Sequence, residues 1–231
     1  MDDILFSPAI ADELNDLVCT QIANHLFLFC NYEPAIPNAL TMDGQYFLGV
    51  QNLYRLYIDC SCILPKQNMM KKWLDSASYQ KYRTLKNTIQ LLRSCIDHNN
   101  SSKNGRREAN RLGEYEQWLY RVIQKNTPVD QKDYQLLVNE LQSLSKQMYD
   151  LVKQVVYKIH SADPHQKDEW IQEWEDETIQ WYSQKGIKRD IFWESWKICI
   201  LHTQILPPMK SISLIKLLIG VCNIVTAIKA S

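Results

Sequence analysis

The chain has 231 residues, 45% of them apolar and 23% charged, which is enough to bury a core and excludes a disordered or collagen-like protein. Six glycines and eight prolines are too few for a β-sandwich built on many tight turns. The net charge is zero, but residues 66–125 contain thirteen basic and five acidic side chains and so carry +8. Such a segment either holds a polyanion or pairs with acidic parts of its own chain.

The seven cysteines are odd in number and include no C-x-x-C pair. This spacing fits neither a disulfide framework nor a zinc knuckle, so it predicts reduced thiols in a cytoplasmic protein. The first residues, Met1-Asp2-Asp3, are acidic where a signal peptide would be basic, and we therefore expect no secretion signal.

Helical periodicity begins near the start of the chain and continues through most of it. Ser7 and Pro8 form a helix start, and the apolar spacing that follows predicts a helix to about Cys30. Further helical runs lie at residues 43–64, 69–74, 78–97 and 107–124. The run at 78–97 has apolar steps of three and four and ends in a polar loop at 98–105.

Two longer helices are predicted next. Thr127 and Pro128 supply a cap and a first helical residue for a helix of about thirty residues. Its heptad-like apolar stripe suits a long bundle helix or the seam of a dimer equally well. Asp163 and Pro164 start the following helix. Its tryptophans lie nearly on one face among acidic residues, at positions Trp170, Trp174 and Trp181.

The remaining residues also favour helices. A run at 191–203 stops before Pro207, and the last segment, 211–231, is apolar. Its longest uncharged stretch has twelve residues, at 217–228, so a buried helix is favoured over a membrane anchor. No strand of period two stands out. The sequence thus predicts an all-α protein: a helical bundle over residues 1–160 and a C-terminal helical extension, 161–231, packed on it.

Several common sites find no support. The sequence contains no G-x-G-x-x-G, G-x-x-x-x-G-K, H-E-x-x-H or G-x-S-x-G motif, which argues against dinucleotide, P-loop, zincin and esterase sites. His160 and His165 flank a helix start without further metal ligands, so we expect surface histidines. His25 and His202 lie inside helical runs and are expected to pack with their hydrogen bonds satisfied.

One constellation remains, at the end of the run 78–97. Arg93 and His98 are separated by four residues and are followed by Asn99 and the polar loop. On an ideal helix the two side chains diverge by about 140°. They therefore converge only if the helix end unwinds or a second subunit brings its own copy alongside.

Residues 91–99, LLRSCIDHN, resemble the R-x(4–6)-H motif of the HEPN superfamily. Its members are small all-α domains, and many are metal-independent ribonucleases or toxins. The resemblance covers roughly residues 1–160. Two positions depart from it. Many members have Asn or another strongly polar residue where this chain has Ser94, and members paired with a nucleotidyltransferase antitoxin often have Tyr where it has Asn100.

The resemblance implies a homodimer whose two motifs line one cleft and cleave RNA. His98 would take the 2′-OH proton or protonate the leaving 5′-oxygen, while Arg93 would contact the phosphate. RNA supplies its own nucleophile, so we expect a 2′,3′-cyclic phosphate product and no metal or cofactor. Residues expected to contact RNA or orient His98 are Ser94, Asp97, Asn99, Lys103, Arg106, Arg107 and Arg111. The expected partners are RNA, a second copy and, for a toxin or defence-system component, an antitoxin or another defence protein.

Two other interpretations stay open. In the first, the two residues have structural roles only: Arg93 pairs with a surface acid, and His98 places a cation at the negative end of the helix dipole. Alternatively, the chain is a non-catalytic helical adaptor that docks a protein partner through the long helix or the tryptophan-rich one, with Trp170 and Trp174 as anchors.

Overall fold

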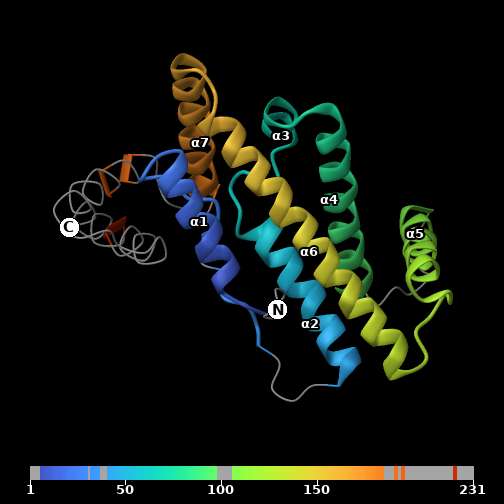
Figure 1. The fold of residues 1–231 in the computed structure, drawn as a ribbon. Helices are drawn as coiled ribbons and strands as arrows, with labels where there is room; N and C mark the ends of the chain where they lie inside the picture. Colours follow the sequence, from blue (N-terminus) through green and yellow to red (C-terminus); the bar gives the residue numbers. More distant parts are fainter. Residues whose placement is uncertain are drawn as a thin grey trace. The chain divides into compact units, whose positions relative to one another are not determined.

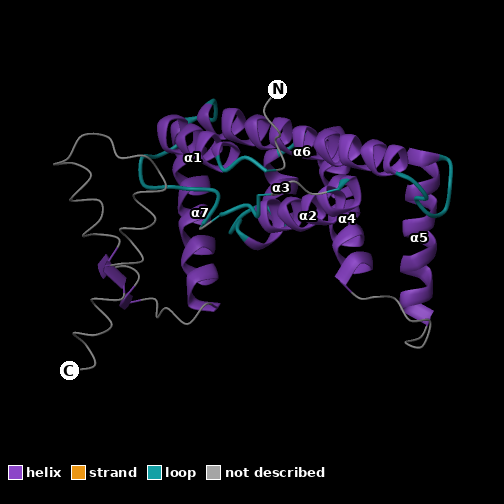
Figure 2. Cartoon of the chain, turned by 90° about the horizontal axis from the view of Figure 1, so that it is seen from below, coloured by secondary structure: helices purple, strands orange, loops and turns teal. Residues whose placement is uncertain are grey.

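The computed structural model describes residues 6–30, 32–36, 41–97 and 106–184, together with residues 190–191, 194–195 and 221–222. These residues form seven α-helices and one π-helix (Figure 2). As predicted, this part of the chain contains no β-strand. The all-α prediction is therefore confirmed. The helices are α1 Ala9–Gln21, α2 Met42–Tyr54, η1 Arg55–Asp59, α3 Gln67–Trp73, α4 Ser76–Asp97, α5 Arg106–Ile123, α6 Gln131–His160 and α7 Pro164–Gln184.

The chain divides into two compact units, each assembled from three separate stretches. Unit 1 comprises Met1–Pro8, Glu33–Asp59 and Asp75–Leu151, and unit 2 comprises Ala9–Tyr32, Cys60–Leu74 and Val152–Ser231. The expected division into residues 1–160 and 161–231 stays a prediction.

Unit 1 is built on α2, α4, α5 and the first two-thirds of α6. Figure 1 shows α5 beside α4, on the side away from α2. The phenol of Tyr57 in η1 donates a hydrogen bond of 2.9 Å to the carbonyl of Ser145, which holds the π-helix against α6. Asn52 bonds both the N–H and the C=O of Ala35 and so ties the segment before α2 to that helix.

The apolar stripe of α6 is buried within the chain. Its members are Leu137, Leu141, Leu144, Met148, Leu151 and Val155, none more than 5% exposed. Because this stripe already has partners inside the chain, it does not supply the dimer seam that the sequence had left open.

Unit 2 centres on stacked indoles from α3 and α7. The rings of Trp73 and Trp174 are 5.7 Å apart and nearly parallel, and Trp170 meets Trp73 edge-on at 6.4 Å. The indole N–H of Trp174 donates to the carbonyl of Phe27 at 3.2 Å. Both Trp170 and Trp174 are buried, so they belong to the core and do not offer a docking face.

The first helix is shorter than predicted. It ends at Gln21, although the apolar spacing suggested a helix to about Cys30. The buried side chain of Asn15 accepts hydrogen bonds from the N–H groups of Leu28 and Phe29 and donates one to the carbonyl of Phe29. Phe29 also forms an antiparallel bridge with Ser61. These contacts satisfy the backbone of an extended, buried segment, so its apolar residues need no helix.

Of the two starts predicted for the later helices, the one at Asp163 is confirmed. Asp163 accepts a bond from the N–H of Gln166, and Asp75, for which no cap was predicted, accepts one from the N–H of Ser78. The predicted Thr127–Pro128 start of the long helix is wrong: α6 begins at Gln131, and its cap is Asp130, whose carboxylate accepts the N–H of Asp133.

Candidate functional site

Arg93 lies in the last two turns of α4, where its half-buried side chain meets the end of α2. Its guanidinium carbon lies 5.8 Å from the centre of the Tyr54 ring. Tyr54 is the last residue of α2, immediately before η1. This cation–π contact holds the guanidinium plane against an aromatic face. The sequence did not single out Tyr54 as a contact of Arg93, because it lies among the apolar residues of a predicted helix and was assigned to the packed face of that helix.

Two of the predicted RNA-binding residues are in direct contact. The guanidinium of Arg111 on α5 donates to the hydroxyl of Ser94 at 3.1 Å. The thiol of Cys95 donates to the carbonyl of Arg111 at 3.8 Å, so α5 lies against the same end of α4. Ser94 and Arg111 are seventeen residues apart in the sequence, and the structure brings them together next to Arg93 in the chain.

The other members of the predicted site are outside what the structure describes. His98, Asn99 and Lys103 lie outside the described residues. The backbones of Asp97 and of Arg106 and Arg107 are helical, but their side chains also fall outside. The relation between the Arg93 guanidinium and the His98 imidazole accordingly stays a prediction.

An aromatic cluster supports this end of unit 1. The hydroxyls of Tyr46 on α2 and Tyr115 on α5 are 3.1 Å apart, and Tyr115 stacks on Trp118 with ring centres 6.2 Å apart. Tyr134 of α6 lies 6.0 Å from Tyr46. Burial raises the pKa of the Tyr46 phenol well above its ordinary value, so it remains a neutral hydrogen-bonding group. The cluster joins α2, α5 and α6, while the contacts of Arg111 with Ser94 and Cys95 hold α5 against α4.

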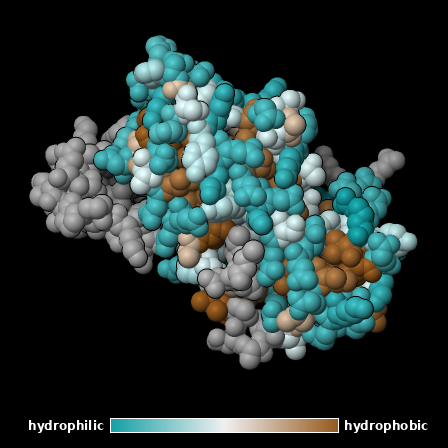
Figure 3. Space-filling view, viewed as in Figure 1, coloured by the Kyte–Doolittle hydropathy of each residue, from teal (hydrophilic) through white to brown (hydrophobic). Residues whose placement is uncertain are grey.

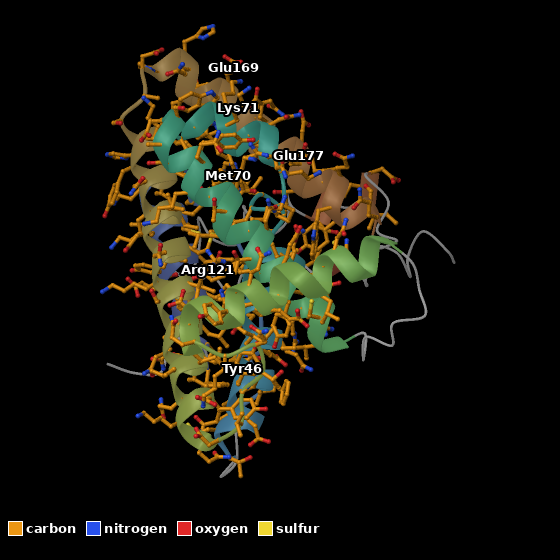
Figure 4. All side chains as sticks on the ribbon, turned by 90° about the vertical axis from the view of Figure 1, so that its right-hand side faces the viewer. Tyr46, Met70, Lys71, Arg121, Glu169 and Glu177 are labelled. Atoms are coloured by element: carbon orange, nitrogen blue, oxygen red, sulfur yellow. The ribbon has the colours of Figure 1, made fainter. Side chains whose placement is uncertain are left out.

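Part of the basic segment pairs with acids of the same chain. Lys72 contacts Glu173 at 2.5 Å and Glu169 at 3.2 Å, and Lys66 pairs with Glu177. Figure 4 shows Lys71 on α3 together with Glu169 and Glu177 on α7. Lys125 holds Asp133 at 2.7 Å. These lysines neutralise acids within their own units, whereas the contacts seen for Arg111 and Arg93 include a hydroxyl and a ring.

The described histidines are packed or exposed as the sequence predicted, with His25 half-buried and His160 and His165 at the surface. The ring of His25 meets Glu175 at 2.7 Å, as expected of a satisfied packing histidine, and that of His160 meets the carbonyl of Gln21 at 2.7 Å. Six cysteines are described and all are free thiols. Cys199 and His202 lie outside the described residues, as does most of the apolar segment 211–231. No group of three potential metal ligands occurs among the residues with known placement.

Comparisons with protein-family models, with curated proteins and with solved structures found no match to this chain. None of the helices that the structure describes is long and apolar enough to cross a membrane.

Proposed function

We propose that the chain is a metal-independent endoribonuclease that acts as a homodimer, in a toxin or a defence system. The observation that supports this function is the bond between Arg111 and Ser94, beside Arg93. It places the Arg111 guanidinium at the end of α4, from which the chain continues directly to His98, while Arg93 on the same stretch of α4 contacts Tyr54 of α2. Guanidinium groups are suited to RNA phosphates because they present several N–H donors in a fixed plane.

The proposed reaction needs only groups of the chain and of RNA. The 2′-oxygen attacks the adjacent phosphorus as its proton passes to one His98, and the bond from phosphorus to the 5′-oxygen breaks. A second His98, from the other copy, gives a proton to the leaving 5′-oxygen. Arg93 stabilises the charge that develops on the phosphate oxygens. The products are a 2′,3′-cyclic phosphate and a 5′-hydroxyl end. Because the α6 stripe is buried, the two copies meet through a different surface.

The test uses the purified full-length protein and end-labelled RNA of mixed sequence. Arg93→Ala and His98→Ala should each lower the cleavage rate by about 100-fold or more, because each removes a group that acts in the transition state. Matched controls are Arg83→Ala, at an exposed arginine of the same helix, and His165→Ala, at an exposed histidine of α7. Both controls should cleave at the wild-type rate.

End-group analysis then identifies the chemistry. A 2′,3′-cyclic phosphate on the product, together with a dimeric mass in solution, supports the proposal. Intact RNA after incubation with the wild-type protein contradicts it, and so does equal cleavage by His98→Ala, which would indicate a contaminating nuclease.

The adaptor function has a weaker basis than the sequence suggested. Trp170 and Trp174, its expected anchors, are buried against Trp73 and Phe27. Substituting them would disturb the core of unit 2 before it disturbed any partner. A partner would have to bind elsewhere.

A further inference from the structure

Unit 1 contains a groove between α4, α5 and α6, with a volume of about 550 Å³. Leu85, Trp118 and Leu144 contribute buried apolar side chains to its lining. Leu136 of α6 also lines it and is 41% exposed, so its side chain is accessible from the groove. Figure 3 shows apolar surface over neighbouring parts of α5 and α6, bordered by hydrophilic side chains.

Two opposite charges line the groove from different helices. Glu140 comes from α6, and Arg121, labelled in Figure 4, comes from α5. Neither forms an ion pair or a side-chain hydrogen bond within the described part of the chain. Glu140 is half-buried, and burial raises the pKa of its carboxyl, an effect that the charge of Arg121 opposes. A partly desolvated carboxylate of this kind gains from any cation brought into the groove.

The shape of the groove indicates what kind of ligand it accepts. Its α6 lining extends from Leu136 to Gln147, which corresponds to roughly 16 Å of helix. All three walls are helices with internally bonded backbones, so an extended peptide would find no strand edge to pair with. The groove is also open to solvent, whereas small-molecule sites enclose most of their ligand. An α-helix docks through its side chains alone, so it needs no strand edge, and it binds in a groove that is open to solvent.

We propose that this groove binds an amphipathic helix of a partner protein. Apolar side chains of that helix, spaced i, i+3 or i+4, and i+7, contact the exposed Leu136 and the half-buried Val122, above the buried floor of the groove. A Lys or Arg on the same helix faces Glu140, and an Asp or Glu faces Arg121. The assignment is independent of RNA cleavage, because none of these residues belongs to the proposed catalytic site.

The probe is a display library of alanine-rich helical peptides of about 16 residues, randomised along one face and selected on the full-length protein. Enriched peptides should share the apolar spacing and a basic residue beside it. Leu136→Asp should weaken their binding by about tenfold or more, because it places a charge in the apolar groove. Val129→Asp is the matched control, since Val129 is 77% exposed and lies outside the groove, and it should leave binding unchanged.

Reversing the charge at residue 140 tests how the peptide lies in the groove. Selection on Glu140→Lys should enrich Asp or Glu at the peptide position that carries Lys or Arg with the wild-type protein. The proposal is overturned if that position ignores the charge at residue 140, or if peptides bind Leu136→Asp as well as they bind the wild type. It is also overturned if the protein is a dimer that Leu136→Asp alone dissociates, because a second copy would then occupy the groove. Circular dichroism of each variant confirms that it is folded.

Discussion

The end of α4 in unit 1 and the α3–α7 face of unit 2 use the cations of one basic segment in different ways. In unit 2, Lys66 and Lys72 pair with glutamates of α7 over a core of stacked indoles. In unit 1, Arg111 bonds a neutral hydroxyl, and Arg93 lies over the Tyr54 ring. A cation paired with a carboxylate has its charge neutralised locally, whereas Arg111, which bonds a neutral hydroxyl, keeps its charge available. The comparison therefore separates the structural part of the basic segment from the part suited to a ligand.

The cores of the units differ as well. Unit 2 depends on large aromatic rings contributed by α3 and α7, which meet in stacked and edge-on pairs. Unit 1 combines the aliphatic stripe of α6 with smaller tyrosine contacts, such as those of Tyr46 with Tyr115 and of Tyr57 with Ser145. Aromatic stacking concentrates burial in a few residues, while an aliphatic stripe distributes it along a helix. Single substitutions should accordingly have their largest effects in unit 2.

The largest effect is expected for Trp174→Ala. This substitution removes a buried indole, its stacking on Trp73 and its hydrogen bond to Phe27. We expect a loss of about 3–5 kcal/mol in the free energy of unfolding, measured by urea denaturation. Trp181→Ala, at a half-buried position of the same helix, should cost clearly less. Equal losses for the two variants would show that the stacked pair is not the centre of unit 2.

Leu141→Ala makes the corresponding cavity in unit 1. Leu141 is fully buried on α6, so its truncation should lower the free energy of unfolding by about 2–5 kcal/mol. Leu136→Ala, on the exposed edge of the groove, should cost much less. The measurement is again urea denaturation at neutral pH. A negligible effect of Leu141→Ala would mean that the stripe of α6 contributes little to the stability of unit 1.

A smaller, pH-dependent effect is expected for Asp75→Asn. The N–H and hydroxyl of Ser78 donate to the Asp75 carboxylate at 2.9 and 2.8 Å, and these bonds lower its pKa below the ordinary value. Because the folded pKa is the lower one, the stabilisation is complete above the unfolded pKa of about 3.9 and is lost as the pH falls through the folded value.

The wild type should therefore be more stable than Asp75→Asn at about pH 6, and the difference should shrink towards about pH 2. Unfolding by urea at a series of pH values measures it. A difference that stays constant over this range would assign the effect of the substitution to packing.

The smallest effect is expected for Lys72→Met, which removes the ion pairs with Glu173 and Glu169. These groups are exposed, so the loss should be below about 1 kcal/mol and should diminish further at about 1 M salt. Thermal unfolding at low and high salt tests this. A large loss that salt does not change would indicate that the methylene groups of Lys72, and not its charge, stabilise unit 2.

Local sequence patterns predicted much of the fold. The existence of the long helix follows from apolar periodicity, and the start of α7 at Asp163 and Pro164 follows from cap chemistry; both act over a few residues. The early end of α1 was not predictable in this way. It depends on Asn15 meeting the backbone of Phe29, and on Phe29 meeting Ser61, which lies 32 residues further along the chain.

The candidate site divides along the same line. The position of Arg93 near a helix end could be predicted from the sequence, because it depends only on the spacing of residues within α4. The contacts with Tyr54 and between Ser94 and Arg111 join residues from different helices. No periodicity of a single helix contains that information.

By itself, the amino-acid sequence determined the helical class, most helix boundaries and the uneven distribution of charge, since each follows from interactions between near neighbours. Only the tertiary structure decided which lysines are neutralised, that the α6 stripe and the tryptophans are buried, and that a groove stays open between α4, α5 and α6. The physical reason is that burial and ion pairing depend on which distant surfaces meet, and the same amphipathic pattern is compatible with several such pairings.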